Sequence, residues 1–347
     1  MKPFVACVLA AAAFMAAGAP ALQAQDFPEA VKSALSASQP TDLSVQGADK
    51  NWFFLRKELE HLANGDLAAV DMAKVNKEGT DPIPAITKYA QELKALGVEL
   101  LLVPVPPKAA IYPEKLSAGA DAKTVPSLLP YYEKLKAAGV EVLDLETVFK
   151  AERAKADGKQ LYCATDSHWS PQACQMVAKL VAEKLKTNPA IAQAGMSGFA
   201  TLPVQDLEFH GDLLTDAQKS SVPKEKLPMQ RAGKSAGADV TTVESDPASP
   251  VLVMGDSHLQ VFRRGGAMLA QQGGFVDHLQ VELGTAVEEF SMQAGGADGP
   301  RREIARATVK SPDFWAKKKV AVWVFTAREF SFGKWNPTIP AKVVKKS

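Results

Sequence analysis

Amphipathic helical stretches alternate along this chain with short, predominantly apolar runs. Residues 81–96 carry apolar side chains at helical spacing, Gly97 supplies a stop, and the apolar run 98–103 follows. Similar apolar runs return later in the chain, at residues 140–145, 251–254 and 320–325. Apolar strands of this kind are buried on both faces, which requires a helical layer on each side of the sheet. The sequence therefore predicts an α/β fold, a three-layer sandwich with a mostly parallel sheet.

The composition is that of an ordinary globular chain. Of its 347 residues, 46% are hydrophobic and 23% are charged, which suffices for one large domain or two small ones. The formal net charge is +1, so the chain has no general field to attract a polyanion. We therefore expect no nucleic-acid partner.

The first residues have the features of a secretory signal peptide. Lys2 precedes an apolar run over residues 4–17, and small residues surround Pro20 and end at Ala24. A run of this length is shorter than the roughly 20 residues that a membrane-spanning helix needs. We expect residues 1–24 to be removed on export and residues 25–347 to form a single domain.

Two cysteines remain once the signal peptide, with Cys7, is removed. Cys163 and Cys174 are an even number in an exported chain, and an oxidising compartment favours a disulfide between them. The alternatives are two small buried residues, or a reactive thiol at the start of a helix. The nearness of a second cysteine disfavours a reactive thiol.

Regular patterning weakens over residues 186–250, where proline, glycine, serine and charged residues interrupt every apolar run. We expect a long surface insertion. Such connections in α/β enzymes often form lids or substrate walls, and flexible padding is the alternative.

A first cluster of chemically capable residues precedes a predicted helix. Asp166 and His168 lie two residues apart in the loop before it, Ser170 fits the helix N-cap and Pro171 the first helical position. A carboxylate at this spacing can hold an imidazole in one tautomer and stabilise its charged form. A bridge between the two cysteines would make the loop rigid, as a preorganised base requires.

A second cluster ends the apolar run 251–254 with Gly255, Asp256 and Ser257 and enters what looks like a helix. Parallel sheets bind ligands at the carboxyl ends of their strands. Backbone N–H groups and a helix start beside Ser257 could stabilise an oxyanion, and His168 is the best available base for its hydroxyl. Ser257 could instead be a helix cap, and Asp-x-His alone is equally weak. Together the two clusters predict a Ser-His-Asp site.

Further motifs resemble the alginate O-acetyltransferase family, whose members carry a domain similar to the SGNH hydrolases. The matching stretches follow in the family's order over most of the mature chain: WFFL at 52–55, VPVPPK at 103–108, TDSHWSP at 165–171, GDL at 211–213, GDS at 255–257 and VWVF at 322–325 with Arg328-Glu329. The resemblance implies an SGNH-hydrolase-like fold.

The resemblance also implies roles for individual residues. Ser257 is then the acetyl-accepting nucleophile, His168 its base and Asp166 the partner that orients the base. Asp256 would shape the turn. In ordinary SGNH hydrolases the serine motif comes before the aspartate and histidine, whereas here, as in this family, it comes after them. Two supporting positions, Lys108 and Arg328, match polar residues of other family motifs and could line the pocket or form structural salt bridges.

By the same resemblance the protein is a periplasmic O-acetyltransferase that moves acetyl groups through a serine acyl-enzyme onto an exopolysaccharide such as alginate. It requires no cofactor. The implied partners are a polysaccharide acceptor, a membrane-bound O-acyltransferase as acetyl donor and a polysaccharide export complex. Some family members continue into a carbohydrate-binding module, which we do not expect here because the chain ends shortly after the Trp323 run. The near-zero net charge offers no general attraction for a polyuronate.

Three alternatives remain open from the residues themselves. A carbohydrate acetylesterase would use the same triad with water as acceptor. A non-catalytic scaffold of an export complex would retain the residues without the reaction. A metal enzyme would use the ligand-like pairs Asp166/His168 and Asp256/His258 together with other residues of suitable type, His210, Asp212, Asp277 and His278.

Overall fold

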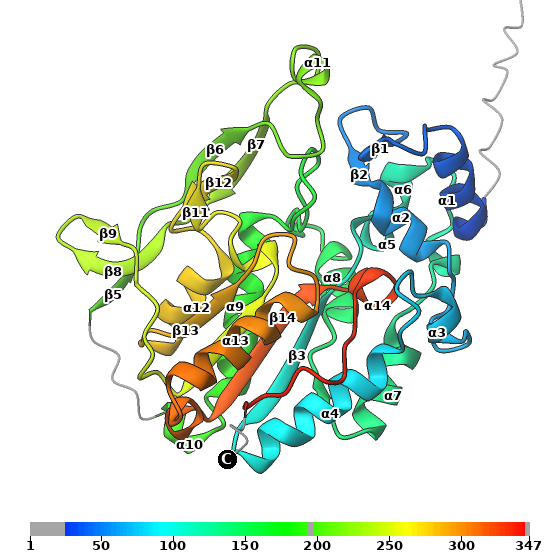
Figure 1. Cartoon of the computed structure of the whole chain (residues 1–347). Coiled ribbons are helices and arrows are strands. Elements are labelled where there is room, and N and C mark those ends of the chain that lie inside the picture. The colour runs from blue at the N-terminus through cyan, green and yellow to red at the C-terminus, as the bar shows by residue number, and fades with distance from the viewer. Residues whose placement is uncertain (1–24, 193–197, 344–347) are drawn as a thin grey trace, which may run out of the picture.

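A central parallel sheet of five strands organises the computed structural model, which describes residues 25–192 and 198–343 (Figure 1). The predicted signal peptide, residues 1–24, lies outside the described residues. Strand order is β13-β10-β14-β3-β4, and every neighbouring pair is parallel. The strands are β3 (Glu99–Val105), β4 (Glu141–Val142), β10 (Val251–Gly255), β13 (Glu288–Ser291) and β14 (Val320–Thr326). The predicted α/β class is confirmed.

Side chains alternate along the strands between two hydrophobic layers. In β14, Val322 packs into one cluster, and its neighbours Ala321 and Trp323 pack into the other. The first cluster is covered by α8 (Leu145–Arg153), α9 (Pro171–Leu185) and α12 (Phe275–Leu283). The second is covered by α4 (Pro82–Ala95), α7 (Leu129–Ala137) and α13 (Asp298–Lys310). Both faces of the sheet are therefore buried, and the three-layer prediction is confirmed.

One strand is shorter than its apolar run predicts, and another is missing from the sequence prediction. The run 140–145 contributes only the two residues of β4, because Asp144 caps α8 by accepting a hydrogen bond from the Thr147 N–H (3.2 Å). Strand β13 begins with Glu288 and Glu289, so its composition does not resemble that of a buried strand. Apolar runs alone therefore identify the central strands better than the edge strands.

The expected helix after Ser257 is wrong. A single 3₁₀ turn, η2 (Ser257–Leu259), follows β10. The Ser257 carbonyl accepts from the N–H groups of both Gln260 and Val261, and Phe262 then adopts a left-handed conformation with φ 58°. This conformation cannot continue a right-handed helix. No helix dipole is therefore available beside Ser257.

The N-terminal part of the described chain packs beside the carboxyl end of the sheet (Figure 1). Its aromatic motif lies in β2 and is buried: Phe53 is fully buried and Phe54 is 1% exposed. The elements here are α1 (Phe27–Ser36), β1 (Ser44–Gln46), β2 (Phe53–Leu55), α2 (Arg56–Leu62), α3 (Met72–Val75), α5 (Lys108–Ile111), α6 (Pro113–Leu116) and η1 (Ala122–Thr124). The motif at 52–55 is therefore mainly core.

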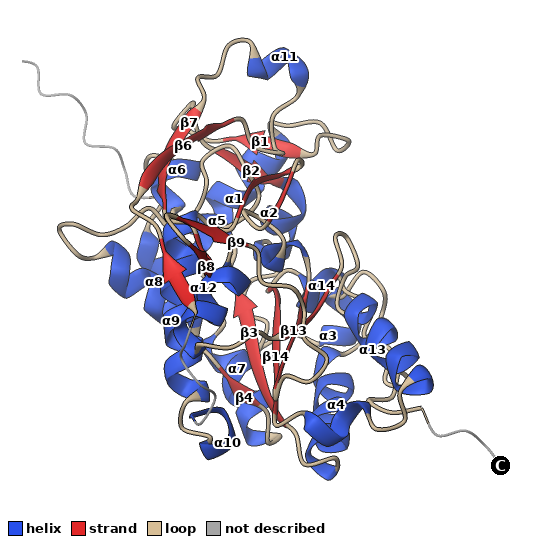
Figure 2. Cartoon of the chain, turned by 90° about the vertical axis from the view of Figure 1, so that its left-hand side faces the viewer, coloured by secondary structure: helices blue, strands red, loops and turns tan. Residues whose placement is uncertain are grey.

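Two small antiparallel sheets occupy most of the predicted insertion, residues 186–250. One has the order β5-β8-β9 (Figure 1), and the other pairs β6 with β7 (Figure 2). The elements are α10 (Pro189–Ala192), β5 (Phe199–Thr201), β6 (Gln205–Phe209), α11 (Asp216–Lys219), β7 (Glu225–Met229), β8 (Ala232–Ala236) and β9 (Asp239–Thr241). Strand β7 contacts α9 and β8 contacts α12, so these strands pack on the helical layer.

The remaining elements are β11 (Arg264–Gly265), β12 (Met268–Gln271), η3 (Phe314–Lys317) and α14 (Glu329–Phe332). Within the described ranges, no helix is long and apolar enough to cross a membrane.

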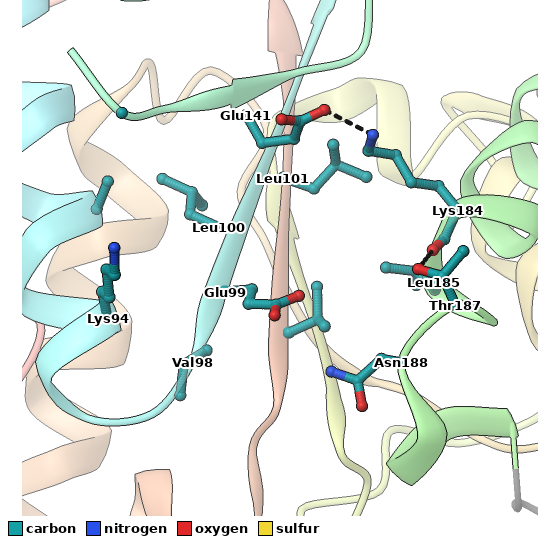
Figure 3. Close-up of a pocket in the computed structure, with 13 residues that line it drawn as sticks. Lys94, Val98, Glu99, Leu100, Leu101, Glu141, Lys184, Leu185, Thr187 and Asn188 are labelled. Carbon is teal, nitrogen blue, oxygen red and sulfur yellow. Dashed lines mark hydrogen bonds and ion pairs between the residues drawn. The ribbon is translucent and has the colours of Figure 1, made fainter. Parts of the chain in front are cut away.

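A cavity of about 520 Å³ lies at the amino ends of β3 and β14, where Figure 3 shows Glu99, Glu141 and Lys184 around it. Ser257 follows the carboxyl end of β10 in the same parallel sheet. This cavity is therefore at the opposite end of the sheet from the predicted site.

Trp323 is the centre of the second hydrophobic layer and provides a test of this packing. It is fully buried, with its ring 5.7 Å from the ring of Tyr89 and 5.7 Å from that of Trp335. We expect Trp323→Ala to lower the free energy of unfolding by about 3–5 kcal/mol, measured by denaturant titration. Trp323→Phe should lower the free energy of unfolding clearly less, because the indole N–H that it removes has no hydrogen-bond partner among the described residues. Equal losses for both variants would contradict this account.

Candidate active site

The segment carrying Asp166 and His168 is a tight loop that leads into α9. An isolated bridge joins Tyr162 to Trp169, and the Ser170 hydroxyl accepts a hydrogen bond from the Ala173 N–H (3.1 Å). Ser170 is the N-cap and Pro171 the first residue of α9, as predicted. The loop therefore enters the helix in a fixed orientation.

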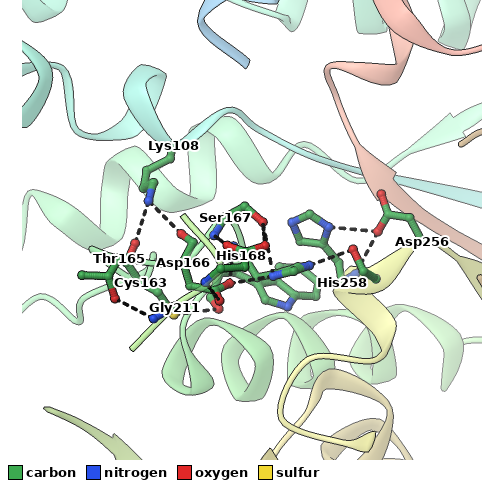
Figure 4. A network of polar contacts seen from close by, with 12 residues as sticks. Lys108, Cys163, Thr165, Asp166, Ser167, His168, Gly211, Asp256 and His258 are labelled. Atoms are coloured by element: carbon green, nitrogen blue, oxygen red, sulfur yellow. Dashed lines mark hydrogen bonds and ion pairs between the residues drawn. The ribbon is translucent and has the colours of Figure 1, made fainter. Parts of the chain in front are cut away.

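A continuous chain of hydrogen bonds joins this loop to Ser257, and Figure 4 shows Asp166 and His168 within it. The Nδ1 atom of His168 is 2.7 Å from Asp166 Oδ1, and its Nε2 atom is 2.7 Å from Ser257 Oγ. The same Asp166 oxygen accepts the His168 backbone N–H at 3.0 Å. The three residues that the sequence singled out thus lie in the order carboxylate, imidazole, hydroxyl.

The Asp166–His168 pair is buried, and its charges stabilise each other. Burial opposes the charged form of His168, but the Asp166 carboxylate outweighs it and raises the pKa of the imidazole. Burial likewise opposes ionisation of Asp166, and His168 together with backbone N–H groups lowers the pKa of that carboxyl. The pair is therefore set to hold a proton on the imidazole while the carboxylate remains ionised.

The turn that carries Ser257 is shaped by its two preceding residues. Asp256 accepts hydrogen bonds from the backbone N–H groups of His258 (2.9 Å) and Thr326 (2.8 Å), which ties the turn to the end of β14. A side chain on Gly255 would collide with the carbonyl oxygen of Val324. The Ser257 backbone N–H has no partner among the described residues, so it is free to donate to a ligand.

Lys108 is buried beneath the loop and does not line a pocket. Its side chain donates to the backbone carbonyls of Cys163 (2.8 Å) and Asp166 (2.8 Å), and the residue is fully buried (Figure 4). Burial lowers the pKa of Lys108, and the nearby carboxylates of Glu58 and Glu225 oppose that effect. Lys108 therefore holds the loop from its carbonyl side.

Glu225 holds the same loop from its N–H side, although no sequence pattern pointed to this residue. From β7 its carboxylate accepts the backbone N–H groups of Ala164 (2.7 Å) and Thr165 (3.2 Å). Burial raises the pKa of Glu225, and these N–H groups oppose that rise. A cation at the carbonyls and an anion at the N–H groups both complement the peptide dipoles of the loop.

Gly211 and Asp212 also contact the loop of Asp166 and His168. The Asp212 backbone N–H donates to Asp166 Oδ2 (2.9 Å), and the Asp212 carboxylate accepts the Ser167 backbone N–H and hydroxyl, both at 2.7 Å. A side chain on Gly211 would collide with the backbone of Thr165 and Asp166. The glycine thus allows the insertion to approach the loop closely.

Arg328, the second supporting residue predicted, forms a salt bridge near the site. Its Nη1 atom is 3.2 Å from Glu58 Oε1 and 3.1 Å from Thr326 Oγ1. Its side chain is 19% exposed, so part of the guanidinium reaches solvent beside the turn that holds Asp256. Of the two roles expected for Arg328, lining a pocket or forming a structural salt bridge, the structure shows the salt bridge.

The predicted Cys163–Cys174 disulfide is wrong for this structure. Both thiols are free and buried in the first hydrophobic layer, and the Cys163 thiol donates to the Trp169 carbonyl (3.5 Å). Burial raises the pKa of both thiols, which makes them poor nucleophiles. The loop owes its rigidity to Lys108, Glu225 and Asp212 instead.

Among the described residues, one group of acidic and histidine side chains is close enough to share a metal ion: Asp166, His168 and Asp212. The four carboxylate oxygens of the two aspartates already accept hydrogen bonds from neighbouring N–H and O–H groups. An ion would have to displace those donors. The other suggested ligands have separate partners: Asp277 pairs with Arg263, His278 with the Gln230 carbonyl and His210 with the Val222 carbonyl.

A three-layer sandwich around a parallel sheet, with a hydrogen-bonded serine, histidine and aspartate near the carboxyl ends of its strands, is suited to a serine nucleophile with a histidine base. Compared with models of protein families, the chain matches the one described as the SGNH hydrolase-like domain of the acetyltransferase AlgX, over residues 45–327. The protein belongs to this family.

Relatives of known name are similar over much of the chain. A probable alginate O-acetylase AlgJ of Pseudomonas fluorescens is 26% identical over 290 residues, which cover 82% of this chain and 67% of that protein. Another of the same name, from Pseudomonas syringae pv. tomato, is 29% identical over 219 residues, which cover 59% and 51%. The matched regions thus span about half to two thirds of these relatives.

Solved structures share the fold. The O-acetyltransferase domain of Pseudomonas putida AlgJ superimposes with a TM-score of 0.60 at 20% identity, covering 83% of this chain and 92% of that domain. Pseudomonas aeruginosa AlgX gives a TM-score of 0.54 at 21% identity, covering 82% and 62%. The SGNH-like fold predicted from the motifs is confirmed.

The state of the cysteines can be tested directly by thiol titration. Because both thiols are buried and free, we expect neither to react with a thiol reagent in the native protein. In denaturant without a reductant, Cys163 and Cys174 should both react fully. A mature protein whose thiols become titratable only after reduction would show that the disulfide forms after all.

Proposed function

We propose that this protein is a serine O-acetyltransferase that moves acetyl groups onto the hydroxyls of an exopolysaccharide such as alginate. The observation that carries the proposal is the contact between His168 Nε2 and Ser257 Oγ at 2.7 Å, with Asp166 on the other side of the imidazole. Membership of the AlgX acetyltransferase family and similarity to proteins named alginate O-acetylases support acetyl transfer as the reaction.

In the first half-reaction Ser257 takes the acetyl group from a donor ester. His168 removes the Ser257 hydroxyl proton as Oγ bonds to the acetyl carbonyl carbon, and Asp166 stabilises the resulting imidazolium. The Ser257 backbone N–H is placed to donate to the oxyanion. The bond from that carbon to the donor oxygen then breaks, and the departing oxygen takes the proton from His168.

In the second half-reaction a sugar hydroxyl replaces the donor. His168 accepts the proton of this hydroxyl while its oxygen bonds to the acetyl carbon, and the bond to Ser257 Oγ breaks. The proton returns to Ser257, so the enzyme is regenerated. No cofactor takes part, and Lys108, Glu225 and Asp212 act by keeping the base in place.

The proposal includes a location and partners. We place the mature protein in the periplasm after removal of residues 1–24, where a membrane-bound O-acyltransferase would supply the acetyl group. The acceptor would be a polysaccharide chain, and association with a polysaccharide export complex would bring it to the enzyme. The AlgJ names of the relatives support the alginate class of acceptor.

The covalent step is tested by mass spectrometry after brief exposure to 4-nitrophenyl acetate. We expect one acetyl group on the peptide that contains Ser257, none in Ser257→Ala, and normal labelling in Ser220→Ala, which changes an exposed serine of the α11 turn. Exhaustive chelation should leave labelling intact. A folded, ester-cleaving protein without the Ser257 adduct would refute the covalent mechanism.

The acceptor is tested by adding an alginate oligosaccharide to the same reaction and measuring acetylated sugar against free acetate. Transfer to the oligosaccharide supports the acetyltransferase. Release of acetate alone, at every oligosaccharide concentration, would identify an acetylesterase instead.

The pH dependence follows from the pair of Asp166 and His168. The base must be unprotonated to accept the serine proton, and Asp166 raises the pKa of His168 above the ordinary 6.5. The rate kcat/KM should therefore rise with pH through a midpoint above 6.5. Asp166→Asn should move that midpoint to lower pH and reduce the rate by about four orders of magnitude. Asp216→Asn, at a fully exposed position, is the control and should leave the profile in place.

A further inference from the structure

A second Asp-x-His pair lies beside the first. His258 Nδ1 is 2.9 Å from Asp256 Oδ1, and its backbone N–H donates to the same oxygen at 2.9 Å. Asp166 and His168 have the same arrangement, at 2.7 Å and 3.0 Å. In the proposed reaction Asp256 shapes the Ser257 turn through its contacts with backbone N–H groups, and the His258 ring takes no part.

The His258 ring packs directly against the catalytic base. Its centroid is 5.0 Å from that of the His168 ring, at an interplanar angle of 63°, and 5.3 Å from that of Trp169. In Figure 4 the ring lies beside His168, and Asp256 is on its far side. His258 is 2% exposed. The imidazole is thus held in one orientation by a carboxylate and by two aromatic neighbours.

The other ring nitrogen of His258 has no assigned partner. Because Nδ1 donates to the Asp256 carboxylate, Nε2 of the neutral ring carries the lone pair. Among the described residues nothing donates to that atom, whereas His168 Nε2 contacts Ser257. His258 Nε2 is not one of the buried side-chain atoms that lack a partner, so this unpaired nitrogen can be reached by a ligand donor.

The chemistry of the second half-reaction places the acceptor next to the His168 ring. The attacking hydroxyl must approach His168, because it gives its proton to His168 Nε2. The His258 ring, whose centroid is 5.0 Å from that of His168, is therefore near the bound acceptor. A sugar carries a further hydroxyl on the carbon next to the one that attacks.

We infer that His258 Nε2 accepts a hydrogen bond from this neighbouring hydroxyl, so that the two imidazoles together recognise a vicinal diol. The inference rests on the proposed acetyltransferase. One hydroxyl loses its proton to His168, and the other keeps its proton and donates to His258. Water occupies only one of the two positions, so His258 favours transfer to sugar over hydrolysis.

The test measures how the acetyl-enzyme partitions. Wild type and His258→Phe are acetylated with 4-nitrophenyl acetate in the presence of an alginate oligosaccharide or of methanol, and acetylated product is compared with free acetate. Loss of one hydrogen bond should lower the ratio for the oligosaccharide about tenfold, through a higher KM, and leave the ratio for methanol nearly unchanged. Equal changes for both acceptors would overturn the inference.

His278→Phe is the matched control, since His278 is a buried histidine of α12 whose Nε2 contacts the Gln230 carbonyl (3.1 Å). It should alter neither ratio. Melting curves of all variants are recorded alongside.

A measurement on wild type alone keeps the inference testable if His258→Phe does not fold. The acetyl-enzyme should prefer cis-1,2-cyclohexanediol, which matches the cis 2,3-diol of the alginate uronates, over cyclohexanol by about tenfold, beyond the factor of two expected from hydroxyl number. Equal use per hydroxyl would overturn the diol site while leaving the acetyltransferase intact. Failure of wild type to acetylate any alcohol would instead refute the proposed function and the diol site with it.

Discussion

The buried ammonium of Lys108 is the contact on which the site depends. It lies beneath the loop of Asp166 and His168 and binds two of that loop's carbonyl oxygens at 2.8 Å. Taking a cation out of water is costly unless its donors are satisfied, so the loop and the lysine order each other. The Glu225 carboxylate binds backbone N–H groups of the same loop. Lys108 and Glu225 together therefore fix the position of the His168 imidazole.

The sequence predicted the framework for physical reasons, and it singled out three residues that the structure brings together. Strands buried on both faces must be apolar, so β3, β10 and β14 could be recognised from composition. Asp166, His168 and Ser257 could be paired because serine activation requires a base and an orienting carboxylate, and the family motifs supported that pairing. The predicted cap at Ser170 is confirmed because capping is a local property of the chain.

The errors share a cause, which is that they concern tertiary contacts. The disulfide was predicted from cysteine count and compartment, but the thiols are free within the apolar layer. Glu225 was missed because it lies in a stretch without periodicity, about sixty residues from the N–H groups it binds. A helix was expected after Ser257 because the left-handed residue Phe262 carries no local signal.

The contacts made by the insertion also restrict which segments can be exchanged between related proteins. Strand β7 brings Glu225, and the segment before α11 brings Gly211 and Asp212, to a loop that lies 45 to 61 residues earlier in the chain. A chimera in which a relative's segment replaced residues 199–241 would also replace the residues that hold the loop of His168. A replacement segment therefore preserves the position of His168 only if it retains those three residues.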